Sequence, residues 1–177
     1  MAVKLYDAPR CPFCARVRLA FAEKGLDYET VEVDLENRPA WLYELNPLGK
    51  VPVLENGFVL PESAVILEYL EELHPERPLL PSGAKARARA RLDVFRFDDR
   101  LGRDWYAFRR GEANDVEARL ADAPVGESLF VDVAYAPWLI RARELYGLEL
   151  GGRVAAWLDE AVERPAFAAE LATVRSL

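Results

Sequence analysis

The chain has 177 residues, of which 51% are hydrophobic and 30% are charged, a balance typical of a globular protein with a sizeable core. Its formal net charge of −7 at pH 7 disfavours nucleic acid and anionic membranes as main partners. There is no apolar run long enough to span a bilayer, and the first residues lack the basic-then-apolar pattern of a signal peptide. We therefore expect a cytoplasmic protein with neither nucleic-acid nor membrane partners.

The first part of the chain alternates between strand and helix patterns. Val3–Tyr6 predicts a strand, and the following helix begins at Pro12 and ends near Gly25, a residue that favours helix C-caps. Later segments predict a strand over 28–34, a short helix over 39–45, strands over 51–54 and 58–60 around an Asn-Gly turn, and a helix over 62–73. The order β-α-β-α-β-β-α is typical of an α/β thioredoxin-like domain with a four-stranded mixed sheet.

The second part of the chain shows helical patterns only. Pro75, Pro78, Pro81 and Gly83 indicate a stiff linker. Helices are then predicted over 84 to about 110, 115–121, 130–146 with a kink at Pro137, 154–162 and 165–174. The predicted organisation is a thioredoxin-like domain over 1–75, a linker over 76–83 and an all-α domain over 84–177.

The two cysteines, Cys11 and Cys14, stand at the start of the first predicted helix. With a single distant histidine, His74, they cannot supply the four ligands of a zinc site, so we expect no metal. A thiol reacts as the thiolate, which the helix dipole and free N–H groups favour at Cys11. Cys11 is therefore the predicted nucleophile, and Cys14 is placed to resolve a mixed disulfide. The alternative interpretation is that both cysteines are simply small residues of the core.

Two further motifs predict a site for a peptide-like ligand. A cis Val51–Pro52 bond would present the Val51 backbone to the Cys motif, while an ordinary trans edge proline is the alternative. Glu62 and Ser63 open a helix whose N–H groups suit an α-carboxylate, with Glu62 beside an ammonium. A simple helix cap made by Ser63 is the alternative there.

Three segments in this order resemble the cytosolic glutathione transferase superfamily: Cys11-Pro12-Phe13-Cys14, the stretch from Asn46 to Leu54, and Pro61-Glu62-Ser63. The sequence is most similar to Cys-type members, namely omega-class transferases, dehydroascorbate reductases and two-domain glutaredoxins. The similarity is dense from Val3 to Pro81. It implies the glutathione transferase fold, with glutathione or a related low-molecular-weight thiol as cosubstrate.

The resemblance also implies roles for individual residues. Cys11 would form a mixed disulfide with glutathione, and Phe13 would flank the thiol. The remaining glutathione-binding residues would be Val51 with a cis Pro52 at the cysteinyl part, Glu62 and Ser63 at the γ-glutamyl end, and Arg38 and Lys50 at the glycine carboxylate. For Arg38 and Lys50, an exposed charged pair is the alternative.

The function implied is a glutathione-dependent thiol transferase, acting by thiol–disulfide exchange or deglutathionylation of a disulfide substrate. Conjugation of glutathione to a small electrophile and a non-catalytic binding or regulatory module are the alternatives. The sequence departs from the family in three places. Cys14 is an additional thiol, Leu129 stands where a capping Ser or Thr precedes Asp132, and the helical domain is short near 111–126. The sequence leaves open whether the protein forms a homodimer.

Overall fold

The computed structural model describes residues 3–177, so Met1 and Ala2, the start of the predicted first domain, lie outside the described residues. The chain divides into two compact units, the first ending at Leu79 and the second spanning Leu80–Ser176. This boundary falls within the stretch 76–83, which the sequence predicts to be a linker. The α/β thioredoxin-like unit followed by an all-helical unit confirms the predicted fold class.

The first unit is built on a four-stranded mixed sheet with the order β2-β1-β3-β4. Strand β1 (Lys4–Asp7) is parallel to β2 (Glu29–Glu32) and antiparallel to β3 (Val53–Glu55). Strand β4 (Val59–Pro61) pairs antiparallel with β3. Val53, the first residue of β3, pairs with Pro61, the last residue of β4. The residues just before β3 and just after β4 therefore lie at the same end of these two strands.

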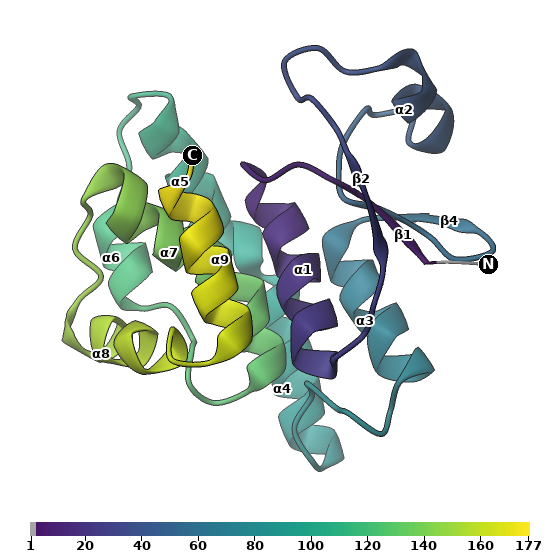
Figure 1. The fold of residues 1–177 in the computed structure, drawn as a ribbon. Helices are drawn as coiled ribbons and strands as arrows, with labels where there is room; N and C mark the ends of the chain where they lie inside the picture. The colour runs from purple at the N-terminus through teal and green to yellow at the C-terminus, as the bar shows by residue number, and fades with distance from the viewer. Residues whose placement is uncertain (1–2) are drawn as a thin grey trace. The chain divides into compact units, whose positions relative to one another are not determined.

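Three helices complete this unit: α1 (Pro12–Lys24), α2 (Ala40–Leu45) and α3 (Ser63–Leu73). Helix α1 is capped at its C-terminus by Gly25, as predicted. Gly25 has a left-handed backbone conformation (φ 60°), which glycine adopts at less cost than other residues. Figure 1 shows α1 and α3 side by side against the strands, while α2 stands apart from them. The core between sheet and helices includes fully buried Leu5, Val17, Val53, Ile66 and Leu67.

A buried ion pair fastens the ends of α1 and α3. Lys24 Nζ lies 2.6 Å from Glu71 Oε1, and the two side chains are 0% and 3% exposed. Lys24 also donates to the carbonyls of His74 and Arg77, at 3.1 and 2.9 Å, and Glu71 accepts from the Leu79 N–H at 2.8 Å. Such hydrogen bonding offsets the cost of removing the two charges from water.

The second unit is arranged around α7 (Leu129–Tyr146), which packs against three other helices of the unit. Its middle, including Tyr135, Trp138 and Leu139, is fully buried. The helices around it are α4 (Ala84–Phe95), α5 (Arg103–Arg109), α6 (Val116–Ala121), α8 (Gly152–Ala161) and α9 (Pro165–Arg175). None of the helices within residues 3–177 is long and apolar enough to cross a membrane.

The prediction of a single long helix over 84 to about 110 is wrong. It is interrupted by a π-helical segment, η1 (Asp98–Gly102), between α4 and α5. Gly102 permits this local packing, since a Cβ there would lie 2.5 Å from Asp98 Oδ1 and 2.8 Å from the Phe97 ring. π-helical segments are rare and often occur at functional sites.

Candidate functional site

Cys11 occupies the N-cap position of α1, directly after the loop that follows β1. It has extended backbone angles (φ −80°, ψ 117°), and its side chain is 9% exposed. Its N–H donates to the Ala8 carbonyl at 2.9 Å, which closes the loop. Because the first N–H groups of α1 have no acceptor within the helix, the Cys11 sulfur lies where a negative charge is stabilised.

Cys14 lies one helical turn further along α1 and is fully buried. Burial raises the pKa of the Cys14 thiol well above its usual value, and the hydrogen bond to Cys11 and the charges of Cys11 and Asp7 raise it further. Cys14 therefore keeps its proton at neutral pH and can donate it as a hydrogen bond to a Cys11 thiolate. The two cysteines are free rather than disulfide-bonded.

The backbone of Val51 faces the sulfur of Cys11. The Val51–Pro52 peptide bond is cis, as expected from the sequence, and Cys11 Sγ lies 3.8 Å from the Val51 carbonyl oxygen. The protonated thiol donates to this oxygen. The Val51 N–H makes no hydrogen bond within residues 3–177. Cys11, Cys14, Val51 and Phe13 belong to one hydrophobic cluster, so the structure brings the first two predicted motifs together.

Glu62 and Ser63 open α3, but Ser63 does not cap it. Glu62 holds the N-cap position with φ 73°, a conformation that non-glycine residues rarely adopt, and Ser63 is the first helical residue. The buried Ser63 Oγ instead accepts a hydrogen bond from Arg16 Nη1 at 3.2 Å. The Glu62 side chain makes no cap hydrogen bond and is exposed. The first-turn N–H groups of α3 are therefore left to a ligand or to water.

Arg16 connects the Cys motif to α3, a link that the sequence did not reveal. It is only 3% exposed, and its guanidinium lies 5.3 Å from the centre of the Phe13 ring. A cation over an aromatic face is attracted by the ring electrons, so Phe13 is oriented by Arg16 as well as by the cluster around Cys11. The one available sequence signal was an arginine inside an otherwise apolar helix face.

The structure does not join Arg38 and Lys50 to this cluster. Both side chains are exposed, and neither makes a side-chain hydrogen bond or ion pair in the described part of the chain. Lys50 contributes its backbone carbonyl, which accepts from Asn46 Nδ2 at 2.9 Å and so fixes the loop before Val51. Their predicted role at a glycine carboxylate remains a prediction.

A second buried pair supports the loop that carries Cys11. Asp7, at the end of β1, is 2.6 Å from Arg18 Nη1, and their side chains are 6% and 16% exposed. Arg18 also donates to the carbonyls of Ala8 and Pro9, at 3.5 and 3.4 Å. The sequence showed these charges but not their pairing. Within residues 3–177, no group of three or more His, Cys, Asp or Glu side chains could hold a metal ion.

Tyr6 packs against the cluster that holds the cysteines, but its hydroxyl already has a partner. Its hydroxyl donates to Glu55 Oε2 at 2.7 Å. That hydrogen bond, partial burial and the negative charges of Glu55 and Glu29 raise the pKa of Tyr6 to about 12. Tyr6 therefore contributes a packed ring rather than a free hydroxyl donor.

Residues 5–78 match the family model described as "Glutathione S-transferase, N-terminal domain". The chain is 38% identical to mouse glutathione S-transferase omega-1 over 97 residues, which cover 54% of this chain and 40% of that protein. It thus spans less than half the length of this relative. It is also 32% identical to the stringent starvation protein A homolog of Haemophilus influenzae over 181 residues, covering 88% of this chain and 83% of that protein.

Solved structures show the same fold over nearly the whole chain. Glutathione transferase Omega 2C from Trametes versicolor superposes with a TM-score of 0.80 at 26% identity, covering 99% of this chain and 96% of that one. Rice GST1, solved in complex with glutathione, superposes with a TM-score of 0.76 at 30% identity and the same coverage. With these matches, the chain belongs to the glutathione transferase superfamily.

Proposed function

We propose that this protein is a glutathione-dependent thiol transferase whose nucleophile is Cys11. One observation carries the proposal: the Cys11 sulfur sits at the N-terminus of α1, 3.8 Å from the carbonyl of Val51 at a cis Val51–Pro52 bond. A thiolate is stabilised at a helix N-terminus, and an adjacent backbone edge suits an extended peptide such as glutathione.

The proposed reaction proceeds in two exchange steps. The Cys11 thiolate attacks the glutathione sulfur of a mixed disulfide, the substrate sulfur leaves as a thiolate that takes up a proton, and Cys11 becomes bonded to glutathione. A second glutathione thiolate then attacks that bond, forming glutathione disulfide and restoring the Cys11 thiolate. In sum, the substrate disulfide is reduced by two electrons, and two glutathione sulfurs are joined.

Glutathione would bind across the end of β3 and β4, where Val51 and the first turn of α3 lie. The free N–H of Val51 can pair with the cysteinyl part, and the opening turn of α3 can hold the γ-glutamyl carboxylate. The exposed Glu62 carboxylate offers a partner for the γ-glutamyl ammonium. Arg38 and Lys50 are candidates for the glycine carboxylate because they are exposed cations on the preceding loops.

Cys14 is proposed to assist rather than to be indispensable. Its raised pKa and full burial keep little of it as thiolate, so its attack on the Cys11–glutathione bond is slow compared with that of a second glutathione. Conjugation to an electrophile is disfavoured because the Tyr6 hydroxyl, bound to Glu55, cannot donate to a glutathione thiolate.

The test is reduction of a glutathione mixed disulfide of a small thiol, with glutathione as reductant. We expect Cys11→Ser to lower kcat/KM at least about a hundredfold, since it removes the attacking sulfur. The matched variant Cys14→Ser should keep activity within about threefold of wild type. Equal activity in wild type and Cys11→Ser would refute the proposal, and loss of activity in Cys14→Ser would instead assign the resolving step to Cys14.

A second candidate function is a non-catalytic regulatory module. The observation in its favour is the alignment with the stringent starvation protein A homologs of Haemophilus influenzae and Pasteurella multocida, which covers 88% of this chain. The same disulfide assay separates the two, because a module without catalysis reduces no mixed disulfide. A wild-type protein that is inactive in the assay and does not bind immobilised glutathione supports the module.

A further inference from the structure

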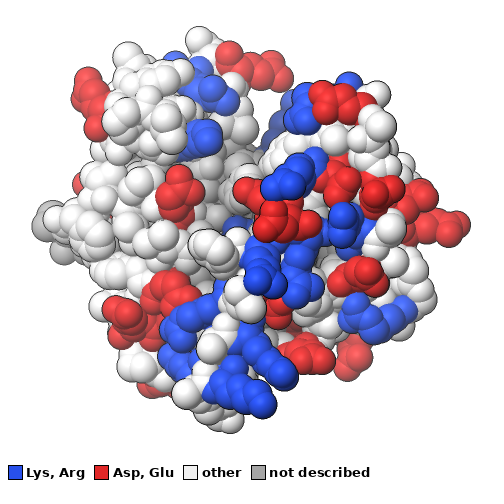
Figure 2. Space-filling model, turned by 180° about the vertical axis from the view of Figure 1, so that it is seen from behind, with Lys and Arg blue, Asp and Glu red and all other residues white. Residues whose placement is uncertain are grey.

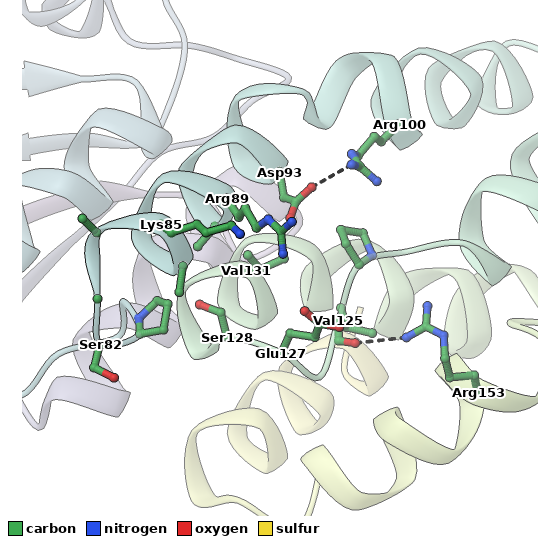
Figure 3. Close-up of a pocket in the computed structure, with 16 residues that line it drawn as sticks. Ser82, Lys85, Arg89, Asp93, Arg100, Val125, Glu127, Ser128, Val131 and Arg153 are labelled. Atoms are coloured by element: carbon green, nitrogen blue, oxygen red, sulfur yellow. Dashed lines mark hydrogen bonds and ion pairs between the residues drawn. The ribbon is translucent and has the colours of Figure 1, made fainter.

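A cavity of about 800 Å³ lies in the helical unit, away from the cysteines in sequence and built wholly from Leu80–Ser176. Its volume falls in the range of small-molecule sites. Figure 3 shows its wall formed by the start of α4, the approach to α7 and the start of α8. Apolar residues, among them Ala90, Val125 and Val131, line part of it, so it can accept an organic ligand.

The cavity wall is positive although the whole chain is negative. Four cations, Lys85, Arg89, Arg100 and Arg153, line it against two carboxylates, Asp93 and Glu127. One of these carboxylates is already committed, because Asp93 Oδ1 lies 2.8 Å from Arg100 Nη2. By contrast, the chain as a whole has a net charge of −7.

Three of the cations have no carboxylate partner. Lys85 and Arg89 make no side-chain hydrogen bond or ion pair within the described residues, and Figure 3 shows both extending from α4 along the cavity. Arg153 is directed by backbone carbonyls only, donating to Val125 O at 3.0 Å and to Ala123 O. Held in this way, Arg153 keeps its charge available at the cavity wall.

The N-terminus of α4 opens onto the same cavity. Gly83 is its N-cap and provides no side chain to accept the first N–H groups, and the residues from Gly83 to Ala86 line the cavity. No acidic residue occupies the first turn, and Lys85 stands there instead. A cation at this end of a helix is unfavourable by itself, so the sequence concentrates positive charge where only an anionic ligand offsets it.

Two buried polar atoms of the wall lack partners. Ser128 Oγ, at the N-cap of α7, and Arg100 Nε are both shielded from solvent and make no hydrogen bond within residues 3–177. Ser128 does not cap α7, because its side chain makes no cap hydrogen bond. Unsatisfied buried groups are costly, and those lining a cavity are commonly satisfied by what the cavity binds.

We propose that this cavity binds a small organic ligand through its phosphate groups, with at least two negative charges. The phosphate would lie among Lys85, Arg89 and the N–H groups of α4, and Ser128 Oγ would donate to it. The apolar wall would receive the organic part. Figure 2 shows that Lys and Arg side chains gather where α4 lies, so the approach to the cavity also attracts anions.

The test measures binding of inorganic pyrophosphate to the full chain by calorimetry and by the shift of the thermal unfolding midpoint. Succinate at equal ionic strength is the carboxylate comparison. We expect saturable binding of pyrophosphate that weakens with added salt, and much weaker binding of succinate. The Lys85→Gln/Arg89→Gln double variant should raise the dissociation constant at least about tenfold, since two charged contacts are lost.

The matched control is Arg87→Gln/Arg96→Gln, which removes the same charge from α4 and its C-cap residue, at positions that do not line the cavity. It should keep the dissociation constant within about twofold of wild type. Ser128→Ala should weaken binding several-fold without lowering the unfolding midpoint of the ligand-free protein. The proposal is overturned if pyrophosphate gives no saturable binding, if succinate binds as tightly, or if both double variants weaken binding equally.

Discussion

Cys11 and Cys14 lie three residues apart, yet their surroundings give them opposite properties. Cys11 is at the helix N-terminus beside the Val51 carbonyl, whereas Cys14 is fully enclosed. Enclosure penalises a Cys14 thiolate, and the proton it retains can then be shared with Cys11. One turn of helix thus separates the proposed nucleophile from a thiol that can donate a hydrogen bond to it. This is a finer division of roles than the sequence spacing alone predicts.

Tyr6 offers a pH-dependent readout of the sheet near this site. In the folded chain it keeps its proton up to a pKa of about 12, because its hydroxyl donates to Glu55, whereas an unfolded tyrosine ionises near pH 10. The stability that this contact contributes is therefore fully present below about pH 10 and is lost as the pH rises toward 12.

We predict that, in an alkaline absorbance titration, Tyr6→Phe loses one tyrosine's share of the absorbance change that occurs near pH 12 in wild type. In Glu55→Gln the same transition should move back toward pH 10, since the negative acceptor is gone. The steep loss of stability above pH 10 should be smaller in both variants than in wild type. An absorbance change near pH 12 that is undiminished in Tyr6→Phe would contradict the prediction.

Several local features of the candidate site could be predicted from the sequence. The N-cap position of Cys11, the Gly25 cap and the cis Val51–Pro52 bond all follow from neighbouring residues. The Arg16–Ser63 contact was missed because its partners are 47 residues apart in the sequence and meet only in the folded unit. The alternative interpretation of Ser63, a simple helix cap, is not what the structure shows, since Ser63 makes no cap hydrogen bond and its hydroxyl accepts from Arg16.

At the scale of elements, the join between β1 and α1 determines where Cys11 lies. Arg18, from the second turn of α1, reaches back to Asp7 at the end of β1 and to the two carbonyls that follow. Strand and helix are thereby held together around the four-residue loop between them. Hydrogen bonds to a charged group are stronger than neutral ones, so the pair can fix the loop more firmly than its length suggests.

We predict that Asp7→Asn destabilises the protein by about 3 kcal/mol, because it leaves Arg18 partly enclosed without its counter-charge. It should also lower the pKa of Cys14, since the negative charge of Asp7 contributes to raising it. Urea denaturation measures the first effect, and the pH dependence of Cys14 alkylation in a Cys11→Ser background measures the second. Glu36→Gln is the matched control: its pair with Arg10 is 86% and 69% exposed and should contribute less than about 1 kcal/mol.

The prediction that was wrong at this scale is the single helix over 84 to about 110 in the helical unit. Residues 84 to 110 contain few helix breakers, so pattern alone predicts one helix. The chain instead forms α4, η1 and α5, and the side chains of Phe97 and Asp98 occupy the space that a Cβ on Gly102 would need. These contacts are between residues four and five apart, and they accompany a change of helix type that the pattern of apolar residues does not encode. The interruption also sets the position of Arg100, which lines the cavity of that unit.

At the scale of the molecule, both units contain a buried ion pair, Lys24–Glu71 in the first and Arg141–Glu170 in the second. The hydrophobic pattern predicted both cores, but it could not predict these pairs. A charged residue in a helix is normally predicted to be exposed, because charged side chains are seldom buried. Arg141 lies in α7 and Glu170 in α9, and a second, more exposed pair, Glu144–Arg175, joins the same two helices at 2.8 Å. Arg141 Nη1 lies 3.1 Å from Glu170 Oε1 and donates to the Pro137 carbonyl at 3.0 Å.

We predict that Glu170→Gln lowers the free energy of unfolding by about 3–5 kcal/mol, because the guanidinium of Arg141 would remain buried without a counter-charge. Asp99→Asn is the control, since its pair with Arg103 is 66% and 77% exposed and should contribute about 0.5 kcal/mol. Chemical denaturation followed by tryptophan fluorescence measures both. Replacing the pair together, as Arg141→Met/Glu170→Leu, should recover much of the loss, since no unpaired charge then remains buried. A Glu170→Gln protein as stable as Asp99→Asn would mean that water or a neighbouring group neutralises Arg141.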